Sequence, residues 1–113
     1  MAYIKEFAGR ILLNVEDDGI REFSGRVLYK IDPEYVRDFS GRILYRIDGD
    51  TIRDFSGRIL LKVENDSVRD FSGRIRCTYD HSAFREFSGR IIYQIDGFLS
   101  HRALMAVIAV LFA

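Results

Sequence analysis

The chain has 113 residues, of which 48% are hydrophobic and 30% charged, a balance typical of a folded protein rather than a disordered segment. Its 17 basic and 17 acidic residues cancel, which disfavours a general polyanion-binding protein. The single cysteine excludes an internal disulfide, and no signal peptide is predicted, so we expect a cytoplasmic protein.

A sixteen-residue repeat starts near the beginning of the chain. Phe7-Ala8-Gly9-Arg10 recurs as Phe-Ser-Gly-Arg with no insertion or deletion, beginning at Phe23, Phe39, Phe55, Phe71 and Phe87. A fixed period is typical of repeat architectures, in which equivalent residues occupy equivalent places in successive units. The repetition also argues against an active site inside the array, because catalysis needs a unique constellation of residues.

The sequence of each unit predicts two strands separated by turns. Ile43, Tyr45 and Ile47 recur at every second position, which is the period of a strand. Turn residues follow at positions 48–50, and a second short strand, 52–55, ends where Gly57 supplies a positive φ. The side chains expected to line the interior are Ile43, Tyr45, Ile47, Ile52 and Phe55, with their equivalents in the other units.

Two all-β architectures satisfy this pattern. We expect a β-solenoid of about six 16-residue coils with a C-terminal capping helix, in which Ile43 neighbours Ile59. The alternative is an antiparallel β-hairpin meander, similar to MORN repeats, in which these two residues lie a strand apart. A solenoid encloses its core, whereas an open meander leaves one apolar face wet unless a partner covers it. A meander separates the equivalent arginines better, and these are Arg10, Arg26, Arg42, Arg58, Arg74 and Arg90.

The repeat ends after Gly97, and the following segment predicts an apolar helix with Ser100 as its N-cap. We therefore divide the chain into a repeat array, residues 1–97, and a capping and association helix, residues 98–113. The apolar segment is too short to span a bilayer, which needs about 20 residues. Because the helix is apolar on nearly all sides, the end of the array or a second subunit must cover it. The residues expected at the association surface of a homodimer or higher homo-oligomer are Leu104, Ala106, Ile108, Val110, Leu111 and Phe112.

Groups that could carry chemistry are few. Ser56 lacks a Gly-x-Ser-x-Gly elbow, so we interpret it as a turn residue. Cys77, His81 and His101 are too few ligands for a zinc site. We therefore expect no enzyme, no catalytic residue, no metal, no cofactor and no small-molecule substrate. The alternative function is binding of a linear polymer, a polysaccharide or a nucleic acid, along the Arg columns. A nucleic-acid partner is not expected, because the net charge is zero.

The residues 52–60, Ile-Arg-Asp-Phe-Ser-Gly-Arg-Ile-Leu, follow a Tyr-Arg-Ile-Asp-Gly turn at 45–49. This unit resembles that of a group of small bacterial tandem-repeat proteins with Ile-Arg-Asp-x-x-Gly-Arg-x-Leu-Tyr-Arg-Ile-Asp-Gly units. The Asp-Gly-Phe-Leu-Ser segment at 96–100, before the apolar helix, is similar to their closing segment. The resemblance covers nearly the whole chain and implies no activity. We therefore predict a non-enzymatic structural or protein-interaction module that self-associates.

Overall fold

The computed structural model describes residues 1–113 and contains twelve strands and one helix. The strands are β1 (Ala2–Glu6), β2 (Ile11–Glu16), β3 (Gly19–Glu22), β4 (Val27–Ile31), β5 (Tyr35–Asp38), β6 (Ile43–Asp48), β7 (Thr51–Asp54), β8 (Ile59–Glu64), β9 (Ser67–Asp70), β10 (Ile75–Tyr79), β11 (Ala83–Arg85) and β12 (Ile91–Gly97). The helix, α1, spans His101–Phe112. The predicted all-β repeat with one C-terminal helix is confirmed at this level.

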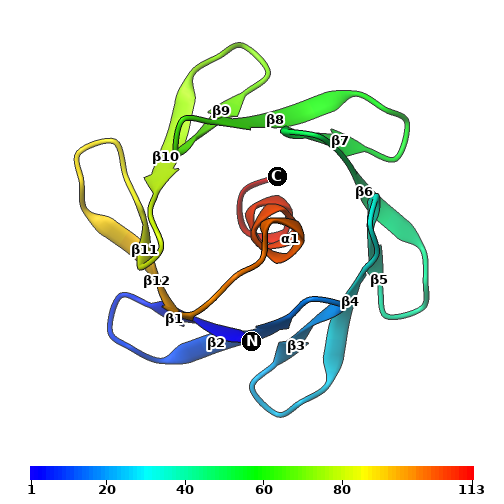
Figure 1. Ribbon diagram of the computed structural model, residues 1–113, viewed down its shortest axis with the longest axis horizontal. Coiled ribbons are helices and arrows are strands. Elements are labelled where there is room, and N and C mark those ends of the chain that lie inside the picture. The colour runs from blue at the N-terminus through cyan, green and yellow to red at the C-terminus, as the bar shows by residue number, and fades with distance from the viewer.

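The sheet closes on itself as a barrel. Each strand pairs antiparallel with the strands before and after it, and β12 pairs with β1 (Figure 1). The predicted solenoid is wrong, because Ile43 pairs with Arg37 and Ile59 with Arg53, so equivalent residues do not stack. The hairpin meander fits instead. Closure of the meander encloses an apolar interior, which was expected only of the solenoid. It also removes both open strand edges.

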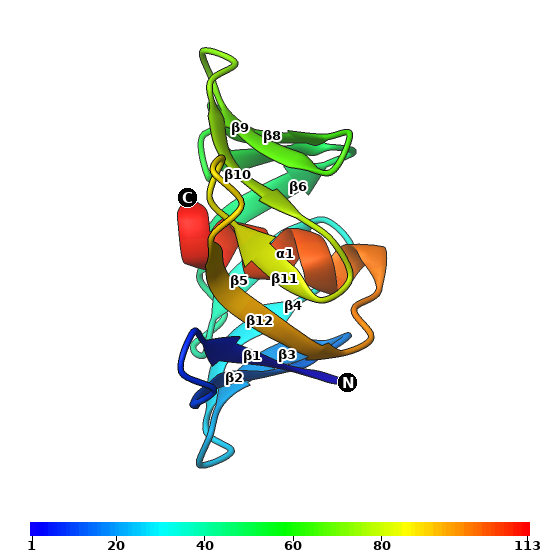
Figure 2. The ribbon, with the colours of Figure 1, turned by 90° about the vertical axis from the view of Figure 1, so that its left-hand side faces the viewer.

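Helix α1 lies inside the barrel, along its axis (Figures 1 and 2). Twelve residues at about 1.5 Å each give a length near 18 Å, which matches the 17 Å depth of the molecule. The N-cap prediction is confirmed, because the Ser100 hydroxyl accepts a hydrogen bond from the Ala103 N–H at 3.2 Å. The helix therefore fills the lumen rather than covering one end of an array. No helix of this protein has the length and apolar character needed to cross a bilayer.

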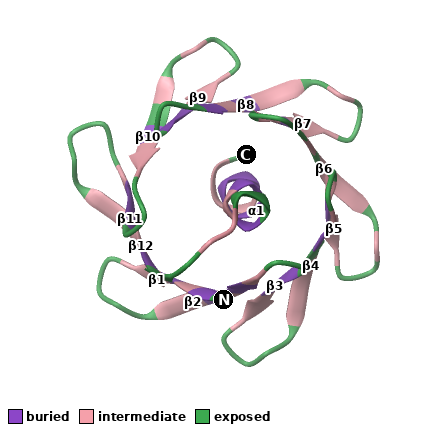
Figure 3. Ribbon diagram, viewed as in Figure 1, coloured by how far each residue is buried: buried purple, intermediate pink, exposed green.

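A β-bulge decides which side chains reach the lumen. Tyr45 lies opposite Val36 but Ile43 lies opposite Arg37, so Leu44 is an extra residue on β6. Tyr45 therefore faces inward, as predicted, whereas Ile43 shares the outer face with Arg37. Leucines at the position of Leu44 in other units pack against the core instead, namely Leu12, Leu28 and Leu60. Buried residues accordingly follow the inner wall and the helix (Figure 3).

The two ends of the barrel carry different connections. Short acidic turns surround the start of α1, where the Ser100 hydroxyl donates to Asp17 at 2.7 Å. The Phe-Ser-Gly-Arg connections splay outward on the side where α1 ends, near Arg76, which donates to the Phe112 carbonyl at 3.2 Å. Figure 2 shows these two sets of connections on opposite sides of the ring.

Candidate interaction surface

Six equivalent loops join a short strand to the next long strand, and we call them the Phe-Arg loops. They are residues 7–10, 23–26, 39–42, 55–58, 71–74 and 87–90. In the fourth loop the Gly57 N–H donates to the Asp54 carbonyl at 3.0 Å, and the Asp54 N–H donates to the Arg58 carbonyl at 2.9 Å. This pattern is typical of a type I turn followed by a glycine bulge, and Gly57 has the positive φ of 97° that the bulge requires. Asp at the first turn position and Gly at the fourth are the residues that such a turn prefers.

The carboxylate of each Asp-containing loop faces its own backbone. The Asp54 Oδ1 atom accepts hydrogen bonds from the Ser56 N–H at 2.9 Å, the Ser56 hydroxyl at 2.6 Å and the Arg58 N–H at 3.0 Å. The hydrogen bond from the Ser56 hydroxyl is the largest cause of the lowered pKa of Asp54. Desolvation opposes it, and the backbone N–H groups of Arg58 and Ser56 lower the pKa further. The same network lowers the pKa of Asp38 and of Asp70. The acidic group of the loop is thus engaged in holding the turn together.

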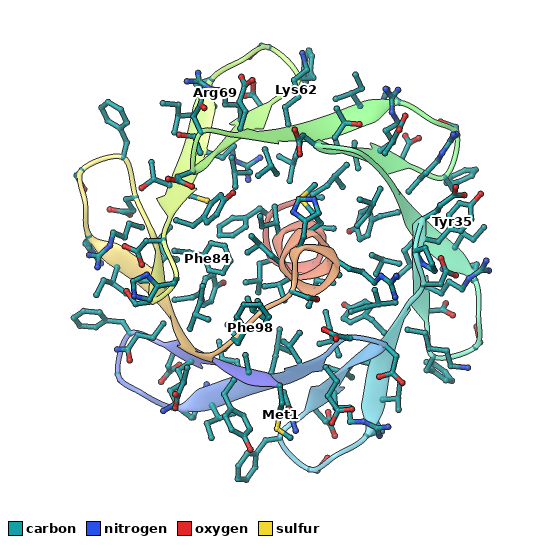
Figure 4. All side chains as sticks on the ribbon, viewed as in Figure 1. Met1, Tyr35, Lys62, Arg69, Phe84 and Phe98 are labelled. Atoms are coloured by element: carbon teal, nitrogen blue, oxygen red, sulfur yellow. The ribbon has the colours of Figure 1, made fainter.

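The phenyl rings of the loops point into solvent. Phe7, Phe23, Phe39, Phe55, Phe71 and Phe87 are between 68% and 80% exposed. The prediction that this column lines the interior is wrong, because a residue at the second position of a tight turn lies beyond the end of the sheet. Phe84 shows the contrast, since it is fully buried inside the ring with its centroid 5.5 Å from that of Phe112 (Figure 4).

The arginine that ends each loop is also exposed. Its side chain is 74% to 81% exposed in the five loops where it approaches the loop carboxylate, at distances from 3.3 to 3.8 Å. Ion pairs this exposed contribute little to stability. Each loop therefore presents a phenyl ring and a guanidinium group outward, with its carboxylate turned inward.

A second set of arginines holds the loops in place. The Arg53 Nη1 atom donates to the Gly57 carbonyl at 2.9 Å, and the same bond is made by Arg21, Arg37, Arg69 and Arg85 at 2.8 to 3.2 Å. The Arg37 Nε atom also contacts Asp32 of the preceding turn at 2.9 Å. These arginine side chains therefore hold the loop backbone in place. Both Arg columns, along which a linear polymer was predicted to bind, run around the ring of the closed barrel.

Apolar grooves lie between neighbouring loops. Phe55 lines a groove of about 740 Å³ with Arg42, Ile43 and Leu44 of the preceding unit. Equivalent grooves of about 360 Å³ and 550 Å³ lie beside Phe39 and Phe71, with residues 26–28 and 58–60 as their other walls. The outward turn of the Ile43 column, caused by the bulge, supplies one wall of these grooves. The phenyl rings of Phe39, Phe55 and Phe71 thus each border an aliphatic surface of the neighbouring hairpin.

The structure separates the residues considered for chemistry. Cys77 is fully buried, and burial raises the pKa of its thiol to about 11. His81 is exposed in the turn after β10 and lines a groove with Asp66 and Phe98 that does not reach Cys77. The Ser56 hydroxyl is engaged with Asp54, which is the turn role predicted for it. No group of three or more His, Cys, Asp or Glu side chains is placed to hold a metal.

The helix residues predicted to form an association surface lie in the lumen. Ala106 and Ile108 are fully buried, and the other four pack against the same core, namely Leu104, Val110, Leu111 and Phe112. The apolar character of α1 on nearly all sides predicted cover by the end of the array or by a second subunit. The strands of the same chain supply that cover, because the meander closes around the helix.

Comparison with known proteins found no matching family model, no matching curated protein and no matching solved structure. The Phe-Arg loops are the most distinctive exposed feature of the molecule. The glycine has a positive φ in all six loops, and the acidic side chain accepts turn hydrogen bonds in four of them. Phe and Arg recur in all six loops without a comparable structural role. This surface was not predicted from the sequence, although one signal was present: the Phe follows the Asp that opens an Asp-Phe-Ser-Gly turn.

Proposed function

We propose that the protein is a non-enzymatic interaction module that binds its partner through several Phe-Arg loops at once. The observation that supports this most directly is the exposure of all six loop phenylalanines, between 68% and 80%, while the other phenylalanine of the strand barrel, Phe84, is fully buried. Burying an aromatic side chain of this size contributes about 1.5–3 kcal/mol. A partner that covers the loops would gain that contribution at each of them.

Repetition favours a multivalent contact. One loop offers a phenyl ring and a guanidinium group, which is too small a surface for a stable complex. Six loops on one rigid barrel bind with a high effective concentration, because the first contact positions the others. The loops need no ordering on binding, since all six are fixed by turn hydrogen bonds and five of them also by an inner arginine.

The proposal is tested by retention on a phenyl column, together with light scattering across protein concentrations. We expect the native chain to be retained and a triple variant, Phe39→Ser, Phe55→Ser and Phe71→Ser, to elute clearly earlier with unchanged thermal unfolding. Phe98→Ser is the matched control, because Phe98 is 78% exposed but does not belong to the loops. Equal retention of the native chain and the triple variant would show that the loops are not the apolar contact surface.

A further inference from the structure

Taking the proposed function as its basis, we propose that the partner is an anionic lipid surface, onto which the ring of Phe-Arg loops docks. The loops combine the two groups that such a surface binds at its boundary. Aromatic rings insert between headgroups, and basic side chains pair with anionic ones. Phe55 is 79% exposed and the Arg58 side chain of the same loop is also 79% exposed, so both groups are presented together.

The distribution of charge determines which end of the barrel faces the lipid surface. At the loops, the acidic side chain is 18% to 38% exposed and the arginine 74% to 81%, so the guanidinium groups dominate the outer surface there. The turns at the opposite end carry five carboxylates that make no ion pair, namely Asp17, Asp18, Glu34, Asp50 and Asp66. Five more are paired with an arginine or lysine, namely Asp32, Asp48, Glu64, Asp80 and Asp96. An anionic surface is therefore attracted to one side of the barrel and repelled by the other.

The arrangement of the loops favours a laterally uniform partner. They are spread around a ring whose long extents are 37 and 34 Å, and Figure 2 shows them on the side where α1 ends. A lipid surface presents the same chemistry to all six loops in any rotational setting about the barrel axis. A protein partner would have to repeat an anionic and apolar site around the same ring. Two copies of this chain placed loop to loop would bring their exposed guanidinium groups together, which like-charge repulsion disfavours.

Vesicle co-sedimentation tests the proposal with the full chain. The probes are vesicles of phosphatidylcholine alone and of phosphatidylcholine with about 30 mol % phosphatidylserine. We expect binding to the anionic vesicles, weak binding to the neutral ones, and loss of binding as salt is raised to about 1 M, where the screening length falls to about 3 Å.

Two triple variants separate the contributions of the loop groups. Arg42→Gln, Arg58→Gln and Arg74→Gln together should weaken binding to anionic vesicles by up to about 100-fold, since each basic residue at such a surface contributes about fivefold. The triple Phe→Ser variant described above should weaken binding by about tenfold or more. Phe98→Ser should bind as the native chain does.

Three results would overturn the lipid assignment: no binding to anionic vesicles at low salt, equal binding to neutral and anionic vesicles, or unchanged binding of both triple variants. Retention on the phenyl column with no binding to vesicles would leave the loops as a contact surface and exclude the lipid partner. Failure of the proposed function is distinct, because the native chain and the Phe→Ser variant would then elute together from the phenyl column.

Discussion

A pair of substitutions to alanine tests the closed barrel most directly. Ile108 is fully buried at the centre of the molecule on α1, whereas Phe55 is 79% exposed at the tip of a loop. Truncating a buried isoleucine costs about 2–5 kcal/mol, because its apolar contacts are lost and a cavity remains. An exposed side chain has few contacts to lose, so Phe55→Ala should change the free energy of unfolding by less than about 0.5 kcal/mol. In the solenoid expected from the sequence the larger effect would fall on Phe55.

Chemical denaturation monitored by circular dichroism measures both changes as shifts of the midpoint at constant slope. For a chain of this length we expect Ile108→Ala to lower the melting temperature by roughly 10–20 °C and Phe55→Ala by no more than about 2 °C. Val107→Ala is a second test of the lumen, because Val107 is also fully buried on α1. A cost above about 2 kcal/mol for Phe55→Ala, with Ile108→Ala close to neutral, would refute the placement of the helix inside the ring.

Three further predictions concern the loops, the turns and the number of units. Gly57→Ala should lower the free energy of unfolding by about 1–2 kcal/mol, measured by thermal unfolding, because Gly57 has a φ of 97° and a Cβ there would meet strain but no neighbouring atom. Ser56→Ala should lower it by less, because the first loop already has alanine, Ala8, at that position. The pKa of Asp80 is lowered to about 2, chiefly by the Ser82 hydroxyl, so its contribution to stability is present above the ordinary value of 3.8 and disappears as the pH falls through about 2. Denaturation midpoints measured from pH 5 to pH 2 should therefore fall less steeply in Asp80→Asn than in the native chain, and identical slopes would contradict this assignment. Deleting residues 43–58 removes one hairpin in register, and we expect the product to lose the cooperative unfolding transition that circular dichroism detects in the native chain; an intact transition would contradict closure around the helix.

Much of the local structure follows from the sequence. The alternation of Tyr45 and Ile47 predicts the inward face of the long strands, and both residues pack against the core. Turn residues mark the hairpin ends, and Ser100 marks the start of the helix. These features depend on neighbouring residues and on backbone preferences, which a single unit already contains.

The sequence did not predict features that depend on pairing between strands. The extra residue at Leu44 moves Ile43 to the outer face, and a simple period of two does not register such a bulge. The pairing of β1 with β12 joins residues 2–6 to residues 93–97, and it depends on the number and tilt of all the strands together. Phe55 is exposed because it lies in a turn, whereas an assignment based on hydrophobicity alone places Phe55 in the core.

The number of units and the apolar helix depend on each other. With strands about 4.8 Å apart and tilted by about 40°, a barrel of twelve strands has a radius of about 12 Å, and one of ten strands about 10 Å. A helix with its side chains has a radius of about 5–6 Å, so twelve strands leave about 6 Å for the side chains that line the wall. Ten strands would leave about 4 Å, which is too little for tyrosine and leucine, and fourteen would open a gap beside the helix. Six hairpins are therefore the number that one helix can fill, and the helix is apolar on every side because strands surround it.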